Sequence, residues 1–383
     1  MKKICLAFLL TIQLVSTASL PKKSWLFYTH VDSTNLHPFA LYDIDEIKRN
    51  YNKDVNSLIF FNGFNSTQKR FSKKLILQSN KTFNEQELSF GKAGSSRESL
   101  LEGLRWAISQ SSDEFIFLNF WNLKNGILNQ TSKSPSKNSI SDKDLRYALF
   151  EVVRSRNGKK IDVLCQDACL MASIENVIAV ADHVKYYVAS QHYIAGYGLG
   201  YKKILNSLNN IIQPKSFALK IVDSYRENYM QANAEYTLSA VDTSKAIKLA
   251  GIVDKISLTL KSMIDEDSDL AIVVRDSLSK TPRYGLNHID LSCFYQNLIN
   301  HLENSDLNIL ITTIDELTYN LKLAIDLINK SVINKTSSEF RAKSMGISIY
   351  FPNNLIIPSY SDLHWSNLYP NWLKFLYKYL GYK

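Results

Sequence analysis

One cysteine of this chain combines a reactive side chain with a position suited to chemistry. Cys169 follows an apolar segment, Lys160 to Cys165, that is typical of a buried β-strand, and it precedes a segment with helical apolar spacing, Leu170 to Ala181. A thiol between a strand's carboxyl end and a helix N-terminus lies in a positive potential that favours the thiolate. Because the thiolate is the nucleophilic form, this position predicts a cysteine nucleophile.

Cys169 and its neighbour Asp167 each leave two interpretations open. A free cysteine is most often buried and inert, so Cys169 can also be structural. The Asp167 carboxylate can orient a substrate or accept a cationic side chain, or it can cap the helix that follows, as Asp often does.

A cysteine nucleophile needs a base, and histidine is the usual one. His30 ends the first predicted strand, and His192 follows the fifth, so both are candidates to reach Cys169. Each also has the simpler interpretation of a solvated histidine or one at the edge of the core. The remaining histidines lie on or near predicted helices and loops and look structural: His37, His183, His288, His301 and His364. The sequence contains no Ser-His-Asp arrangement, phosphate-binding glycine loop or His-Glu-x-x-His zinc motif.

Short apolar runs alternate with amphipathic segments through the first half of the chain. The predicted strands are 25–29, 57–62, 115–121, 160–165 and 186–190, and the predicted helices are 39–48, 96–109, 141–154 and 170–181. This alternation predicts an α/β fold whose mostly parallel sheet is covered by helices on both faces. Such sheets bind ligands beyond the carboxyl ends of their strands. We therefore expect one rim to gather residues 29–34, 62–66, 121–130, 166–169 and 190–200.

The second half is predicted to be mostly helical. Helices are expected at 201–208, 216–232, 244–265 and 307–333, and a late strand at 344–351. Neither an internal repeat nor a long linker is visible. Residues 19–383 are therefore predicted to form one domain, with an α/β core at 19–200 and a helical part with the late strand at 201–383.

Residues 1–18 have the pattern of a secretory signal peptide. Lys2 and Lys3 precede an apolar run from Ile4 to Val15, and small residues follow that run. A membrane-spanning helix needs about 20 apolar residues, and no later segment is apolar for that long. The sequence therefore predicts a secreted or periplasmic protein with no stable membrane anchor after signal cleavage.

Cysteine count and charge exclude several classes of protein. Cys5 leaves with the signal, and the remaining Cys165, Cys169 and Cys293 cannot all pair within the chain, so we expect no disulfide framework. No Cys/His pair at ligand spacing accompanies them, which argues against a metal site. The net charge is +9, and near +7 without the two signal lysines. Because the positive charges are scattered, they predict a solvated surface and no nucleic-acid partner.

Several segments, in order along the chain, are similar to landmarks of the clostripain family of cysteine peptidases. The segment Asp167 to Met171 resembles the family's nucleophile motif, with Cys169 in the catalytic position. The other similar segments are Trp25–Tyr28 with Asp32, Asn35–Leu41, Tyr187–Ser190, Gly196–Tyr201, Thr237–Asp242, Ile289–Leu291 and Gly346–Pro352. This resemblance covers nearly the whole mature chain. It implies a caspase-like α/β/α sandwich and a Cys–His dyad that cuts peptides or proteins after Arg or Lys, often after self-processing and with calcium.

Two parts of the chain depart from the family's pattern. The family places its general-base His in a Trp-Asx-His-Gly-x-Gly-like turn after the third strand, and here Trp121 to Gly126 reads WNLKNG, with Leu123 in place of the His. Leucine cannot transfer a proton. The family's loop after the fifth strand carries acids, including an Asp between two Gly that helps to bind the substrate's cation. In this chain Gln191 and Tyr197 are uncharged, so Asp167 is the acid that the pocket keeps.

The sequence thus supports two hypotheses. The first is a catalytically degenerate clostripain homologue, a pseudoenzyme that binds a peptide or protein through the former substrate cleft. The second is an active cysteine endopeptidase that uses Cys169 with His30 or His192 as a non-standard base. No cofactor is expected; calcium is implied by the resemblance alone, because the chain has no contiguous acidic ligand loop.

Overall fold

The computed structural model describes residues 23–31, 33–65, 67, 69–88, 97–111, 115–122, 140–210 and 213–382. The predicted signal peptide, residues 1–18, lies outside these ranges, and so do Asp32 and Leu123.

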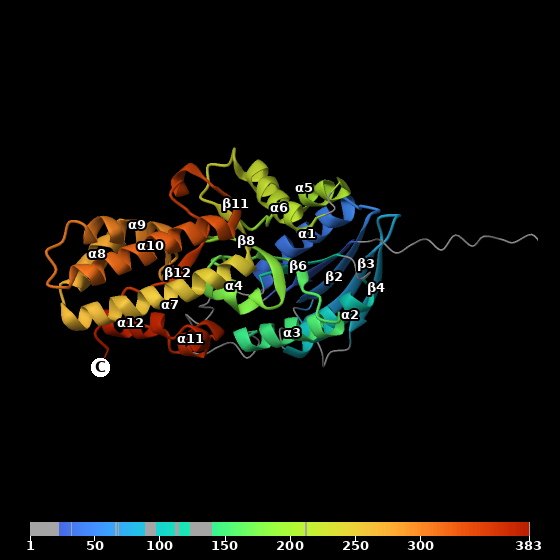
Figure 1. Ribbon diagram of the computed structural model, residues 1–383. Helices are drawn as coiled ribbons and strands as arrows, with labels where there is room; N and C mark the ends of the chain where they lie inside the picture. Colours follow the sequence, from blue (N-terminus) through green and yellow to red (C-terminus); the bar gives the residue numbers. More distant parts are fainter. Residues whose placement is uncertain are drawn as a thin grey trace, which may run out of the picture.

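A nine-stranded sheet crosses the molecule (Figure 1). The order of its strands is β11-β8-β7-β6-β5-β1-β2-β3-β4. Its strands are β1 (Lys23–Thr29), β2 (Val55–Phe64), β3 (Arg70–Leu77), β4 (Phe83–Leu88), β5 (Phe115–Trp121), β6 (Ile161–Asp167), β7 (Val184–Ala189), β8 (Thr237–Asp242) and β11 (Val332–Ser337). The five central strands pair in parallel, and they are β7, β6, β5, β1 and β2. The pairs that β3 and β4 form at one edge, and β8 and β11 at the other, are antiparallel. The predicted α/β fold with a mostly parallel central sheet is confirmed.

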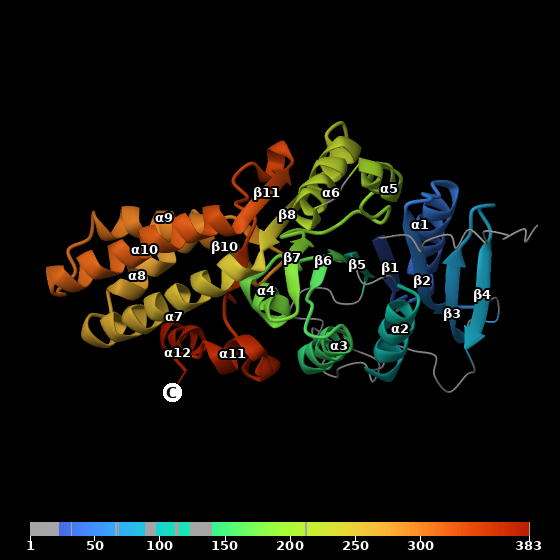
Figure 2. The ribbon, with the colours of Figure 1, turned by 45° about the vertical axis from the view of Figure 1, so that its right-hand side comes forward.

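Alternating apolar side chains divide the core between the two faces of the sheet. Along β1, Trp25 and Phe27 belong to one buried cluster, whereas Leu26 and Tyr28 belong to the other. The first cluster includes residues of α1 (His37–Arg49), α5 (Tyr201–Ser207) and α6 (Pro214–Tyr229). The second includes residues of α2 (Arg97–Ser109), α3 (Asp142–Ser155), α4 (Ile174–Ala181) and α7 (Thr243–Glu266). Figure 2 shows α1, α5 and α6 on one side of the sheet and α2 and α3 on the other.

Local sequence explains where α3 begins. Ser141 Oγ accepts a hydrogen bond from the Asp144 backbone N–H at 3.1 Å, and the Asp144 carboxylate accepts one from the Ser141 N–H at 3.3 Å. This capping box satisfies two backbone donors that a helix N-terminus would otherwise leave unpaired. The apolar residues Leu145, Leu149 and Val152 then face the core. The helix predicted at 141–154 is confirmed.

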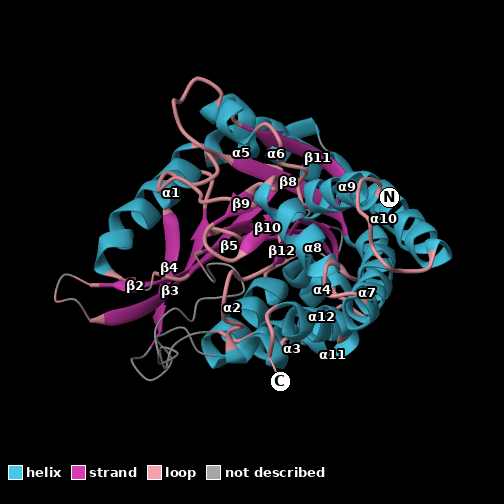
Figure 3. Cartoon of the chain, turned by 90° about the vertical axis from the view of Figure 1, so that its left-hand side faces the viewer, coloured by secondary structure: helices cyan, strands magenta, loops and turns pink. Residues whose placement is uncertain are grey.

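The second half of the chain adds a helical arm and a small sheet. The arm consists of α7, α8 (Leu270–Ser279), α9 (Leu291–Leu302) and α10 (Ile311–Ser331), which extend together away from the large sheet (Figure 1). The small sheet contains β9 (Arg283–Tyr284), β10 (His288–Asp290) and β12 (Ser348–Tyr350), and it lies near the middle of the view along the arm in Figure 3. The last helices are α11 (His364–Leu368) and α12 (Asn371–Tyr379). Within the ranges given above, none of the helices is both long and apolar enough to cross a bilayer.

Two parts of the sheet differ from the sequence prediction. The helix expected at 307–333 begins at Ile311 and ends at Ser331, because the chain from Val332 to Ser337 pairs with β8 as the edge strand β11. The hairpin of β3 and β4 was not predicted at all. Its outer strand is largely exposed, and charged side chains such as Lys73 and Glu85 alternate with the apolar ones, so its apolar signal is weak.

Candidate functional site

The carboxyl ends of the central strands converge on one rim, as predicted, and backbone hydrogen bonds join the segments that follow them. The His30 N–H donates to the Trp121 carbonyl at 2.9 Å, which links the ends of β1 and β5. The Asn122 N–H donates to the Asp167 carbonyl at 2.9 Å, linking β5 to β6. The Leu170 N–H donates to the His192 carbonyl at 3.1 Å, which links the segments after β6 and β7.

A cavity of about 90 Å³ opens at this rim, and Cys169 lies in its wall, partly exposed. We call it the Cys169 cavity. Its lining residues are Leu36, Phe39, Trp121, Asn122, Asp167, Ala168, Cys169, Ile194, Ala195, Gly196 and Gly198. Of the predicted site residues, the structure therefore brings Cys169 and Asp167 together in one cavity, whereas His30, His192, Gln191 and Tyr197 do not line it.

The prediction that a helix starts directly after Cys169 is wrong. Helix α4 begins at Ile174, with Ser173 as its N-cap, and Leu170 has a left-handed φ of 62°. The chain between them is extended because its backbone groups bond to neighbouring segments. The Ala172 N–H donates to the Ser190 carbonyl at 2.9 Å, and the Ala172 carbonyl accepts from the Ser348 N–H, also at 2.9 Å. Four residues, Leu170 to Ser173, therefore separate Cys169 from the first residue of the helix.

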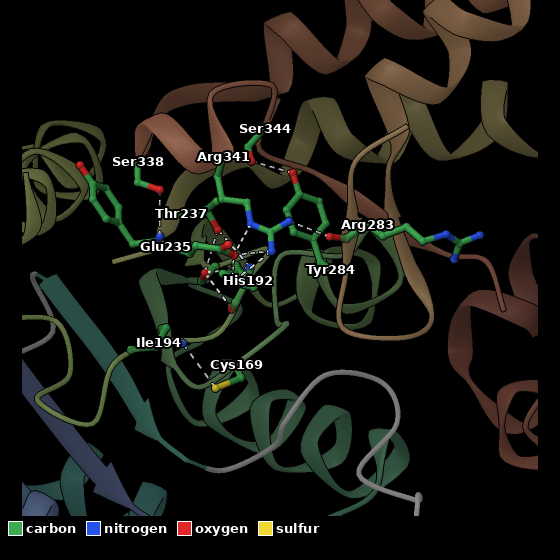
Figure 4. A network of polar contacts seen from close by, with 12 residues as sticks. Cys169, His192, Ile194, Glu235, Thr237, Arg283, Tyr284, Ser338, Arg341 and Ser344 are labelled. Atoms are coloured by element: carbon green, nitrogen blue, oxygen red, sulfur yellow. Dashed lines mark hydrogen bonds and ion pairs between the residues drawn. The ribbon is translucent and has the colours of Figure 1, made fainter. Parts of the chain in front are cut away.

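The thiol environment also contradicts the prediction of a favoured thiolate. Burial raises the pKa of Cys169, and the negative charge of Asp167 raises it further. The Ile194 backbone N–H donates to Cys169 Sγ at 3.4 Å and lowers the pKa in part (Figure 4). The net direction is upward, so the structure favours the protonated thiol.

His192 lies at the rim, but its ring is held by a different set of residues. Its Nε2 is 2.8 Å from Glu235 Oε2, and the Arg341 guanidinium, 3.4 Å from Nε2, also pairs with Glu235. Burial and the charge of Arg341 lower the pKa of His192, and Glu235 offsets this in part. Figure 4 shows His192 within this network, while Cys169 points toward Ile194. Within the described chain, no hydrogen bond or ion pair joins His192 to Cys169.

His30 is buried at the end of β1. Burial, with a smaller contribution from Arg70, lowers the pKa of its imidazole to about 4, so the ring is neutral at pH 7. Its backbone N–H bonds to Trp121 and its carbonyl accepts from Asn122 Nδ2 at 3.1 Å. Its ring Nδ1 has no hydrogen-bond partner among the described residues. No hydrogen bond among those residues joins His30 to Cys169.

Two buried carboxyl groups meet behind the Cys169 cavity. Asp167 lines the cavity and accepts a hydrogen bond from the Tyr201 hydroxyl, and burial raises the pKa of Asp167 to about 7. Asp43, on α1, accepts a hydrogen bond from Trp121 Nε1 at 2.8 Å. Burial, together with the charge of Asp167, raises the pKa of Asp43 to about 9. At neutral pH the pair therefore retains protons that two exposed carboxyls would lose, and a cation placed against it would favour ionisation.

Gly198 is the residue against which both carboxyls lie. A Cβ built on Gly198 would be 2.6 Å from Asp167 Oδ2 and 3.0 Å from Asp43 Oδ2, and the residue has a left-handed φ of +59°. Only glycine combines that backbone with that close approach. The interpretation of Asp167 as a helix cap is wrong, since Ser173 caps α4.

Comparison with known proteins now decides the family. The sequence model of the Clostripain family, Peptidase C11, matches residues 27–372. The chain belongs to the Clostripain family. Among curated proteins, no sequence is similar enough to be counted as a relative.

Solved structures of the Clostripain family share the fold. A secreted C11 cysteine protease from Bacteroides thetaiotaomicron, in complex with an irreversible peptide inhibitor, has 17% identity and a TM-score of 0.64 over 90% of this chain and 98% of that one. The same organism's secreted C11 protease "iotapain" has 16% sequence identity and a TM-score of 0.63, over 92% of this chain and 99% of that one. An inactive zymogen C11 protease from Parabacteroides distasonis has 19% sequence identity and a TM-score of 0.61, over 92% of this chain and 99% of that one. At these identities the likeness shows a common fold.

Within this Clostripain-family fold, the loop after β7 places its two predicted site residues differently. Gln191 is buried, and both ends of its amide are used: Nε2 donates to Asp290 at 3.0 Å and Oε1 accepts from the Gly346 N–H at 2.8 Å. Tyr197 is exposed, and its ring contacts the Phe39 ring of α1 at 5.7 Å between centroids. Gln191 is therefore held by two hydrogen bonds inside the protein, whereas the Tyr197 side chain is exposed on its surface.

Among the described residues, no cluster of metal ligands is present at this site. In the ranges that the structure covers, no group of three or more His, Cys, Asp or Glu side chains is arranged to hold a metal ion. The described residues therefore offer no carboxylate cluster that would fit calcium. Cys165, Cys169 and Cys293 are all free thiols.

Sequence reasoning missed Asp43, although a signal was present. The helix predicted at 39–48 turns its apolar face inward through Ala40, Ile44 and Ile47, and Asp43 falls on that same face at helical spacing. A carboxylate in an otherwise apolar stripe must find a buried partner, and its partner is Trp121.

Proposed function

We propose that this Clostripain-family chain is a catalytically degenerate homologue that binds a peptide or protein in the Cys169 cavity without hydrolysing it. The observation that carries the proposal is that neither candidate base lines the cavity or makes a hydrogen bond to the thiol within the described chain. His192 is engaged by Glu235 and Arg341, and His30 is buried away from the cavity lining. The sequence position after β5 where the family has its histidine is occupied by Leu123, which lies outside the described residues.

Cysteine-peptidase chemistry requires a base within hydrogen-bond reach of the thiol, about 2.6–3.2 Å, to accept its proton and return it to the leaving amine. The polar group that contacts Cys169 Sγ in the described chain is the Ile194 N–H, which donates and cannot accept. The raised pKa of Cys169 keeps the sulfur protonated at neutral pH. Among the described residues, no hydrogen bond therefore links the thiol to a group that could carry its proton.

The same cavity retains features that suit peptide binding. Phe39 and Trp121 supply apolar surface, while Asp167 supplies an ionisable carboxyl in the wall, backed by Asp43. A Lys or Arg side chain that entered the cavity would place its positive charge against this pair. We therefore propose that the ligand presents a basic residue, although the family's loop acid is replaced by Tyr197.

The second candidate is an active peptidase, and one observation favours it. In the described chain neither His30 Nδ1 nor His192 Nδ1 has a hydrogen-bond partner, and burial lowers the pKa of both rings, which leaves them neutral and able to take up a proton. Movement of the rim would be needed to bring His30 to the thiol, because Asn122 and Trp121 hold its backbone in place.

Calorimetry with blocked hexapeptides tests the proposal. Peptides that hold one Arg or Lys should bind more tightly than a norleucine control, and they should be intact by mass spectrometry afterwards. Asp167→Asn keeps an acceptor for the Tyr201 hydroxyl but removes the charge. This variant should lower the affinity for the basic peptides by about tenfold or more. Cys169→Ala should leave binding unchanged. Cleavage that depends on Cys169, or equal affinity for Arg and norleucine peptides, would overturn the proposal.

A further inference from the structure

A second pocket lies on the other side of the loop that borders the Cys169 cavity. It has a volume of about 260 Å³ and is lined by Tyr42, Glu46, Tyr197, Gly200, Asn228 and Tyr229. We call it the tyrosine pocket. Tyr197 stands in its wall, and the residues before and after Tyr197 in the chain, Gly196 and Gly198, line the Cys169 cavity. One short loop therefore separates the two spaces.

Aromatic faces form much of the tyrosine pocket. The rings of Tyr42 and Tyr197 meet edge to face, with centroids 5.3 Å apart, and the two side chains are 50% and 61% exposed. Tyr229 is positioned by a hydrogen bond of 2.7 Å from its hydroxyl to the Gly198 carbonyl. Exposed aromatic rings at this density are unusual on a solvated surface and are typical of a binding site.

The charge of the tyrosine pocket is negative. Glu46 is its charged lining residue, and none of its six lining residues is basic. Glu46 Oε2 accepts from the Tyr201 N–H at 2.7 Å, and its other oxygen has no hydrogen-bond partner in the described chain. Besides Glu46, the buried carboxyls of Asp167 and Asp43 lie close enough to Tyr229 to raise its pKa when they are ionised.

We propose that the tyrosine pocket binds the cationic side chain of a second Lys or Arg of the peptide whose first basic residue enters the Cys169 cavity. This inference rests on the proposed function, since it needs a peptide in the neighbouring cavity. An ammonium or guanidinium group is attracted by tyrosine faces and by a carboxylate with a free oxygen. An apolar side chain would instead cover the Glu46 carboxylate without pairing it, which is unfavourable. The ligand is thus a peptide with two basic residues.

Paired peptides separate this inference from the proposed function. The probes are blocked hexapeptides of Ala and Gly with one Arg, alone or with a Lys placed in turn at each other position. With the wild-type protein, Lys at one or two positions should increase the affinity by about threefold or more, and Lys elsewhere should have less effect.

Three variants with the same two-peptide comparison complete the test. Tyr197→Leu keeps an apolar contact with Phe39 but removes the π face, and Glu46→Gln keeps an acceptor for the Tyr201 N–H but removes the charge. Both should abolish the gain from Lys while the single-Arg peptide still binds. The matched control, Tyr197→Phe, should keep the gain. If the single-Arg peptide binds but Lys adds nothing at any position, or adds equally in all variants, the inference is overturned and the proposed function stands. If no basic peptide binds, both are overturned.

Discussion

The backbone N–H of Ile194 donates a hydrogen bond to Cys169 Sγ at 3.4 Å. The predicted nucleophile thus has a donor beside it, contributed by the loop after β7. A donor can stabilise charge on sulfur, but it cannot remove the thiol proton. Since burial raises the pKa of Cys169 overall, this contact is consistent with the proposal that the thiol is not activated.

The first prediction concerns the reactivity of that thiol. Its pKa lies above the ordinary value of about 8.5, so the rate of alkylation by iodoacetamide should still be rising at pH 9 and should show no plateau near neutral pH. A Cys293→Ser background removes the other partly exposed thiol, and Cys169→Ser in that background should abolish the reaction. A plateau below pH 7 would show an activated thiolate, contrary to this account.

The second prediction concerns stability and pH. The folded-state pKa of Asp43, about 9, is raised above the unfolded value of about 3.9, so its stabilising contribution is complete below pH 4 and is lost as pH rises toward 9. Asp43→Asn does not titrate and still offers an acceptor to Trp121 Nε1. Its unfolding free energy, relative to wild type, should therefore increase between pH 4 and pH 9 by more than about 1.4 kcal/mol. Urea unfolding of both proteins at several pH values measures this difference in free energy. A difference that stays constant with pH would contradict the prediction.

The third prediction links peptide binding to the protonation of Asp167. A basic side chain should bind the ionised carboxyl, whose folded pKa is about 7, so affinity for Arg peptides should fall as pH decreases from 8 to 5. The slope should approach about tenfold per pH unit below the pKa, as expected for one linked proton. Calorimetry of wild type and Asp167→Asn measures this, and the variant should lose the dependence. An equal slope in both proteins would assign the proton to another group.

The fourth prediction tests the close approach at Gly198. Gly198→Ala should lower the unfolding free energy by more than about 2 kcal/mol, because the left-handed backbone strains alanine and its Cβ would meet the Asp167 and Asp43 carboxyls. Gly158→Ala is the matched control. Gly158 also has a left-handed φ, +81°, but its Cβ would meet no described atom within 4 Å, so about 1 kcal/mol should be lost. Equal losses in the two variants would show that backbone strain alone explains glycine at position 198.

The sequence predicted the sheet at the site better than it predicted the side chains there. The segments with His30, Asp167 and His192 reach one rim, and β1 pairs with β5, because near-continuous apolar strands leave few arrangements for a parallel sheet. The direction of each ring was not predictable. Glu235, which holds His192, comes from a segment more than 40 residues away that carries no pattern of its own.

The start of α4 shows a second limit. The segment after Leu170 was expected to be helical, but hydrogen bonds between Ala172 and both Ser190 and Ser348 delay the helix until Ile174. Local propensity is weaker than such pairing, so the Cys169 environment changes from a helix terminus to a loop. The sequence shows that position 123 is a leucine. That this leucine stands where the family has its general-base histidine stays a prediction.

The central claim is that Cys169 has no base, and peptide hydrolysis tests it most directly. Wild type and Cys169→Ala, each in excess over a mixture of peptides with Arg, Lys or neutral residues at the cleavage position, are incubated for hours and read by mass spectrometry. Single turnovers would be visible under these conditions. The account predicts that neither protein cleaves any peptide, so the wild type and Cys169→Ala give the same result. Cleavage by the wild type that Cys169→Ala abolishes would contradict it.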